Sequence, residues 1–90
     1  MERFFVVHAV SSGATQDLIW EKCHVLATNA VGGAKWLRSY FVPDRDELIC
    51  DWEAPDEAAV RASLEAAGTE EQAPVKDISL AVYIDPDFFK

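Results

Sequence analysis

The chain has 90 residues, half of them apolar, and its 16 acidic and 8 basic side chains give a formal charge of −8. This length fits one small domain with a packed core. The acidic balance lacks the basic footprint that nucleic acids and anionic membranes require, so we expect neither as a partner. No apolar run reaches the ~18 residues of a membrane span, and the two cysteines fit reduced thiols. We therefore expect a cytoplasmic protein.

The first third of the chain predicts a strand followed by a helix. Residues 3–9 form a nearly continuous apolar run, which is typical of a central strand covered on both faces. Thr15 is a plausible N-cap, and apolar residues then recur at helical spacing over residues 16–29. A Val-Gly-Gly sequence at residues 31–33 ends this helix and leads into the next strand.

Residues 34–54 predict a β-hairpin, because strand-forming residues flank a polar turn that begins with a proline. A four-residue turn places Arg38 opposite Asp51 and Trp36 opposite Glu53. One face of the hairpin is then apolar. The other face carries an Arg–Asp pair framed by aromatic side chains.

The last third predicts a second helix and a fourth strand. Asp56 is the expected N-cap of the helix, and Gly68 ends it. Residues 75–84 alternate between apolar and polar, as a half-buried strand does. A proline then prevents the strand from continuing. We therefore divide the chain into an α+β domain (residues 1–85) and a C-terminal tail (residues 86–90), whose two phenylalanines could cover a groove on a partner subunit.

The element order β-α-β-β-α-β predicts a ferredoxin-like α+β sandwich, a four-stranded antiparallel sheet with both helices on one face. The opposite face is too aromatic for a plain solvent face and too polar for a plain core. Two such faces packed together enclose a semi-polar cavity, so we expect a homodimer with a dimeric α+β barrel. The expected open-face residues are Trp36, Arg38, Tyr40, Ile49, Asp51, Glu53, Asp77, Ser79 and Tyr83.

Four stretches of the sequence carry a resemblance to a known family, namely residues 10–15, 33–40, 48–61 and 66–68. They resemble a small domain-of-unknown-function family that includes a nickel-responsive, nickel-binding protein. The similarity covers roughly residues 4–82, and the Cys-Asp-Trp-Glu-Ala-Pro-Asp run is its most specific part. The resemblance implies a ferredoxin-like dimer and makes nickel a candidate ligand.

A metal site is the sharpest functional hypothesis, because imidazole suits nickel and other divalent transition metals. His8 ends a central strand and could open into the cavity. Members of the resembling family often have a histidine in the first helix, and His24 matches it if the following connection is shorter here. A dimer could complete such a site from two halves. The alternative places His24 at an ordinary surface position.

A ligand-binding cavity is the second hypothesis. Arg38 could anchor an anionic or carbonyl group between aromatic walls, while two carboxylates of one strand could accept protons. The alternative is that Arg38 and Asp51 form only a structural ion pair. The candidate ligand-binding residues are Arg38, Asp51, Tyr40, Trp36, Tyr83 and Glu53.

These observations predict a homodimeric protein that binds a small molecule or a metal ion, with nickel as the first metal to test. The alternative is a cofactor-free dimeric α+β barrel enzyme, monooxygenase- or isomerase-like, that acts on a small organic substrate.

Overall fold

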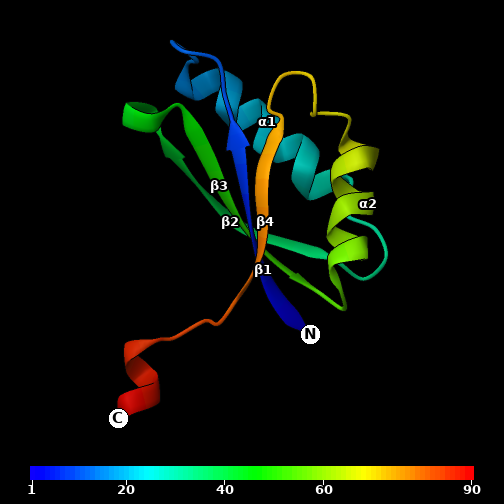
Figure 1. Ribbon diagram of the computed structural model, residues 1–90, viewed down its shortest axis with the longest axis vertical. Helices are drawn as coiled ribbons and strands as arrows, with labels where there is room; N and C mark the ends of the chain where they lie inside the picture. Colours follow the sequence, from blue (N-terminus) through cyan, green and yellow to red (C-terminus); the bar gives the residue numbers. More distant parts are fainter.

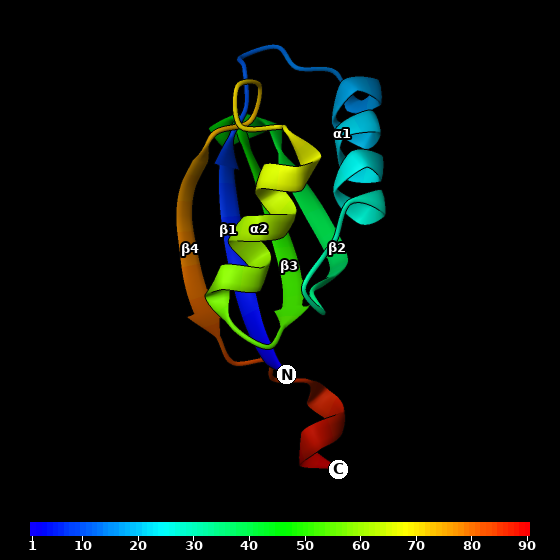
Figure 2. The same ribbon diagram turned by 90° about the vertical axis from the view of Figure 1, so that its right-hand side faces the viewer.

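The computed structural model describes residues 1–90 and confirms the predicted ferredoxin-like fold. Its strands pair in the order β2-β3-β1-β4, and every pair is antiparallel. Both helices cover one face of the sheet and leave the other face open (Figures 1 and 2). The elements are β1 (Glu2–Ala9), α1 (Gln16–Thr28), β2 (Lys35–Val42), β3 (Glu47–Ala54), α2 (Glu57–Ala67) and β4 (Val75–Ala81), with short 3-10 helices at Pro43–Arg45 and Pro86–Phe89.

The helices begin where the sequence predicts. The Thr15 hydroxyl accepts a hydrogen bond of 3.3 Å from the backbone N–H of Leu18 at the start of α1. The Asp56 carboxylate accepts one of 2.9 Å from the N–H of Ala59 at the start of α2. Gly68 ends α2 with a φ of +66°, a backbone conformation that residues with a Cβ adopt only at an energetic cost. Neither helix has the length or hydrophobicity needed to cross a bilayer.

The hydrophobic core lies between the helices and the covered face of the sheet. Alternate residues of β1 and β3 point into it, as the period of a strand requires. Trp52 on β3 is the largest side chain that is fully buried there. The core side chains include Phe4, Val6, Ile19, Leu26, Leu48, Cys50, Trp52, Val60 and Leu64.

The predicted hairpin register is correct at Arg38 and Asp51 but wrong at Trp36. The pairing shifts between Trp36 and Arg38, so that Trp36 lies opposite Trp52 instead of Glu53. Leu37 is the extra residue of this β-bulge. The bulge turns Trp36 to the helix-covered face, where its half-buried indole packs against the core.

Strand β4 ends at Ala81, three residues before the predicted end. Ala81 pairs with Arg3, which lies at the start of β1, so the strand has no neighbour beyond this point. Residues 82–85 then run away from the sheet and carry the tail on the side opposite the helices (Figure 1).

Candidate functional site

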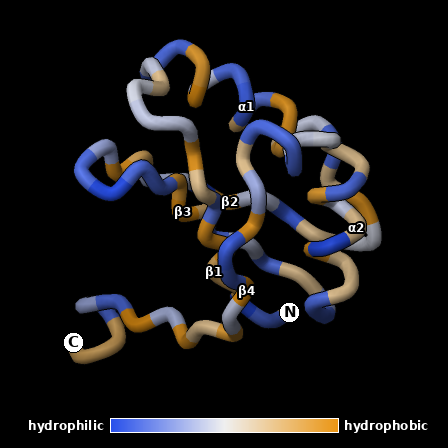
Figure 3. The backbone as a smooth tube through the Cα atoms, turned by 45° about the horizontal axis from the view of Figure 1, so that its top comes forward, coloured by the Kyte–Doolittle hydropathy of each residue, from blue (hydrophilic) through white to orange (hydrophobic).

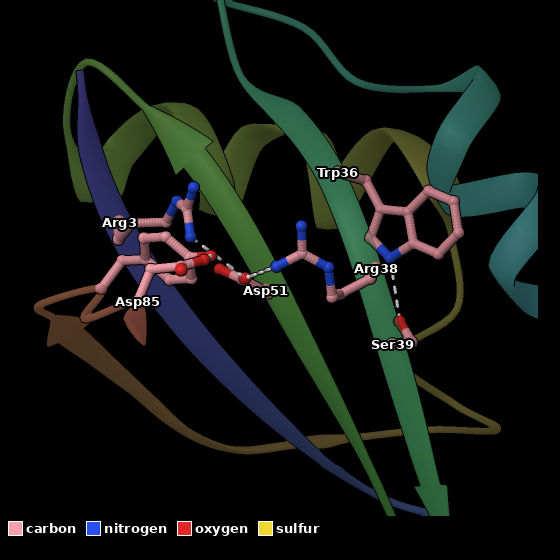
Figure 4. Close-up of polar contacts among 7 residues, drawn as sticks. Arg3, Trp36, Arg38, Ser39, Asp51 and Asp85 are labelled. Carbon is pink, nitrogen blue, oxygen red and sulfur yellow. Dashed lines mark hydrogen bonds and ion pairs between the residues drawn. The ribbon is translucent and has the colours of Figure 1, made fainter. Parts of the chain in front are cut away.

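The open face of the sheet is centred on the buried carboxylate of Asp51. Its Oδ2 accepts a hydrogen bond of 2.7 Å from Nη1 of Arg38 and lies 3.4 Å from Nη1 of Arg3 (Figure 4). Strand β3 lies between β2 and β1, so a side chain on its open face receives one cation from each neighbour. The second oxygen, Oδ1, is buried and has no hydrogen-bond partner.

Arg3 connects this centre to the segment that follows β4. Its guanidinium carbon lies 4.5 Å from the centroid of the Tyr83 ring, within the range of a cation–π contact. The Tyr83 hydroxyl donates a hydrogen bond to Asp85, which raises the pKa of Tyr83 and lowers the pKa of Asp85. The Phe88 ring meets the Tyr83 ring edge-on, at 5.8 Å between centroids.

A second carboxylate on the same face of β3, Glu47, has a similar environment. Lys76 donates to its Oε2 at 2.6 Å, and Nη2 of Arg45 lies 2.9 Å from its Oε1. The hydrogen bond from Lys76 is the main reason why the pKa of Glu47 is lowered. Buried carboxylates are stable only with such partners, so each is fixed by two cations.

The structure brings together most of the predicted ligand-binding residues. Arg38, Asp51 and Tyr83 share one network through Arg3, and Tyr40 lies exposed beside Ile49 on the same face. Glu53 also belongs to this face but makes no ion pair.

Trp36 is separated from the group by the sheet, because its indole N–H donates to Ser39 at 2.8 Å on the covered side (Figure 4). Sequence analysis does not identify Arg3 or Glu47, because the Arg3–Asp51 and Lys76–Glu47 contacts depend on the pairing of distant strands. The sequence feature that could indicate a role for Arg3 is its positive charge at the start of an otherwise apolar central strand.

The two histidines lie apart from the open face. His8 points to the helix-covered face and is 1% exposed; its Nδ1 donates to the carbonyl of Ala73 at 2.8 Å, and its buried Nε2 has no partner. His24 is exposed on α1. No three His, Cys, Asp or Glu side chains converge to hold a metal ion within this chain.

The burial of His8 predicts a pH-dependent stability. Burial lowers its pKa below the usual 6.5, although the Ala73 bond and Glu70 oppose this change. As the pH falls below this usual value, the unfolded chain binds a proton that the folded protein does not, so the free energy of unfolding should fall. Urea unfolding between about pH 7.5 and 5.5 should show this slope in the wild type and in His24→Gln. His8→Gln should flatten it, and an unchanged slope would contradict the prediction.

A groove with a volume of ≈ 790 Å³ lies on the other side of β2, between this strand and α1. Trp20, Trp36 and Phe41 contribute its aromatic surface, and Cys23 lies along its wall. Burial raises the pKa of Cys23, and it raises the pKa of Cys50, beneath Ser39, to about 12. Both thiols are therefore protonated at neutral pH, as expected for packing residues.

Comparisons with known proteins agree with the resemblance. The family described as "Nickel responsive protein SCO4226-like" matches residues 4–76. No curated protein matches the chain. Among solved structures, the crystal structure of SCO4226 from Streptomyces coelicolor A3(2) is similar, with a TM-score of 0.76, 21% identity, and coverage of 92% of this chain and 99% of that chain. This structural likeness shows the shared fold, and the family match covers most of the sequence. The chain belongs to the SCO4226-like family of nickel-responsive proteins.

Proposed function

We propose that this protein is a homodimer that binds a small organic anion between the open faces of two sheets. The observation that carries this proposal is the convergence of Arg3 and Arg38 on one buried carboxylate, beside aromatic rings, on a face that no helix covers. Guanidinium groups recognise carboxylates and related anions, and aromatic walls hold the apolar part of such a ligand.

The composition of the open face supports the dimer. Phe5 of the central strand is 43% exposed, Tyr40 is 59% exposed and Tyr83 is 44% exposed. Aromatic side chains exposed on one face of a sheet are the kind of surface that a partner subunit covers. The apolar run of β1 is typical of a strand covered on both faces, yet helices cover only one. A second sheet would supply the missing cover and add core to a small domain.

Arg38 is the better anchor of the two arginines. Its side chain is 47% exposed, and its bond to Asp51 uses one of the five N–H donors of a guanidinium group. The remaining donors can meet a ligand at the surface of the sheet. The Asp51 carboxylate fixes the orientation of Arg38, which reduces the entropy lost on binding.

Light scattering during size-exclusion chromatography tests the dimer, and a monomer at micromolar concentration would contradict it. A thermal-shift titration with benzoate and with aliphatic carboxylates tests the site. We expect a concentration-dependent rise in melting temperature for the wild type that Arg38→Gln abolishes. Arg45→Gln is the matched control, because Arg45 also pairs with a buried carboxylate of β3 but lies in the turn before that strand, away from Asp51. Equal responses in both variants would exclude Arg38 as the anchor.

Nickel is the second candidate ligand, and family membership favours it. The residues of one chain do not fit a nickel centre, because His8 is enclosed in the core and the buried carboxylates of the sheet are engaged by cations. A nickel site would therefore need groups from two copies, with His24 as the imidazole at the surface. Calorimetric titration with nickel chloride, compared between wild type and His24→Gln, tests this candidate. The cofactor-free enzyme stays a prediction.

A further inference from the structure

The segment after β4 is apolar and leaves the body of the protein. Val82 is 82% exposed and Phe89 is 80% exposed, and Ile84 and Phe88 are also exposed. Figure 3 shows both hydrophobic and hydrophilic residues along this segment. Residues 82–84 have high strand propensity, yet no strand pairs with them, because the antiparallel β1 begins beside Ala81. Residues 77–90 also lie outside the family match.

The groove between α1 and β2 is the complementary feature. Trp20, on its rim, is 74% exposed, which is unusual for the largest apolar side chain. Strand β2 forms one edge of the sheet, so the backbone groups on its outer side are open to another strand. An extended segment can add to such an edge and place side chains in an adjacent groove.

The charges of the two features also match. Strand β2 carries Lys35 and Arg38 and no acidic residue, although the whole chain has a net charge of −8. The segment 82–90 carries Asp85 and Asp87 against the single cation Lys90. A segment with net negative charge should therefore favour this edge over the acidic remainder of the surface.

The positions of the two features favour a second copy over the same chain. Strands β4 and β2 are the opposite edges of the sheet, about 14 Å apart at the usual spacing of strands. The segment leaves on the open side, whereas the groove lies on the helix side. Arg3 contacts the Tyr83 ring and holds the start of the segment at the open face, from which it points toward a sheet packed on that face.

We propose that residues 82–85 of one copy add to the β2 edge of a second copy, and that Phe88 and Phe89 fill the groove between α1 and β2 of that copy. This inference rests on the proposed homodimer. It gives the groove and the C-terminal segment a role in holding the two copies together. The exchange would cover Trp20 and would pair the free β2 edge of each sheet. It also places residue 89 of one chain next to Cys23 of the other.

A directed thiol exchange tests the contact. A variant with Phe89→Cys and Cys23→Ala is activated at residue 89 as the mixed disulfide with thionitrobenzoate and is then mixed with the wild-type chain. The exchange is run at mildly alkaline pH, because burial raises the pKa of Cys23. The ionised fraction of Cys23 attacks the mixed disulfide, forms the disulfide between the chains and releases coloured thionitrobenzoate, so oxidation states balance. Cys50 should not react, because burial raises its pKa to about 12. We expect a covalent heterodimer whose peptide map shows position 89 of the variant linked to Cys23 of the wild-type chain.

Two matched controls make the result specific. A partner chain with Cys23→Ala should release no thionitrobenzoate. Activation at Glu71→Cys, an exposed position in the loop before β4, should give no linkage to Cys23. Absence of the linkage between position 89 and Cys23 would overturn the proposal. A further variant carries Phe89→Cys and retains Cys23, and a disulfide formed only within one chain of that variant would also overturn it.

Removal of residues 86–90 provides a second measurement. We expect the dimer dissociation constant, measured by analytical ultracentrifugation, to rise by about tenfold or more, since buried aromatic anchors dominate such contacts. An unchanged dissociation constant would contradict the docking. Failure of the docking remains distinguishable from failure of the proposed dimer, because a wild-type monomer rejects both, whereas a wild-type dimer without the linkage rejects only the docking.

Discussion

Replacement of Asp51 by alanine should lower the free energy of unfolding by about 2–3 kcal/mol. Asp51 is 5% exposed, and its carboxylate pairs with both Arg38 and Arg3. Without it, the two guanidinium groups face each other with no anion between them. The loss of unfolding free energy should stay below the ~3–5 kcal/mol seen when one partner of a fully buried ion pair is removed. Arg38 is half exposed, so its guanidinium group can be solvated by water instead. Urea unfolding at neutral pH and fixed protein concentration measures the change.

Two further variants separate charge from packing at this position. Glu53→Ala lies two residues away on the same face and makes no ion pair, so its effect should remain within about 0.5 kcal/mol. Asp51→Asn keeps the shape and an acceptor oxygen but removes the charge, so its loss should be intermediate. If Asp51→Ala were as stable as the wild type, the cost of burying the carboxylate would equal the gain from its two partners, and the network would not stabilise the fold.

The sequence predicts only part of the network formed by Arg38, Asp51 and Arg3. Contacts between residues close in the sequence are predicted, and contacts between distant residues are not. The Arg38–Asp51 pair depends on a short turn that sets the local register, and it is correct. Arg3 joins through the pairing of β1 with β3, which connects residues 48 positions apart and leaves no local pattern. Helix caps such as Thr15 and Asp56 act over three residues, so the helix starts are predicted well.

Trp36 shows where the alternation of a strand is ambiguous. Trp36 and Leu37 are adjacent and both apolar, so alternation alone cannot tell which one faces the core. The sheet settles this with a bulge at Leu37, which gives the larger indole the covered position and a partner in Ser39. The predicted end of β4 fails for a different reason, since strand propensity continues to Ile84 but the neighbouring strand does not.

His8 shows a related limit. Its alternation with Phe4 and Val6 places it on one of two faces of β1, and the sequence does not say which face the helices cover at that end. The deciding contact is the hydrogen bond to the carbonyl of Ala73, in a loop 65 residues away. Burial under that loop removes His8 from the open face, so the candidate anion site depends on arginines and aromatic rings without an imidazole.

Trp52→Ala should have the largest effect of any single change in the chain, a loss of about 3–5 kcal/mol. The side chain is fully buried between Trp36 and Phe4 on the neighbouring strands, and it forms the part of the core directly behind the open-face network. A domain of this size has a total stability of about 5–15 kcal/mol, so the variant should be largely unfolded or close to it at 37 °C. Circular dichroism during thermal unfolding measures the loss.

Trp52→Phe is the informative comparison, because this substitution has two opposite effects on the free energy of unfolding. The smaller ring loses apolar contact and leaves a cavity, but it also removes an indole N–H that is buried without a partner. An unpaired buried donor costs about 1–3 kcal/mol, which offsets much of the lost contact. We therefore expect Trp52→Phe to lose about 1 kcal/mol or less, well below the loss in Trp52→Ala. Equal losses of unfolding free energy in Trp52→Phe and Trp52→Ala would contradict this expectation. They would show that the indole N–H is hydrogen-bonded, for example to water, and that this hydrogen bond stabilises the core as well as the volume of the side chain.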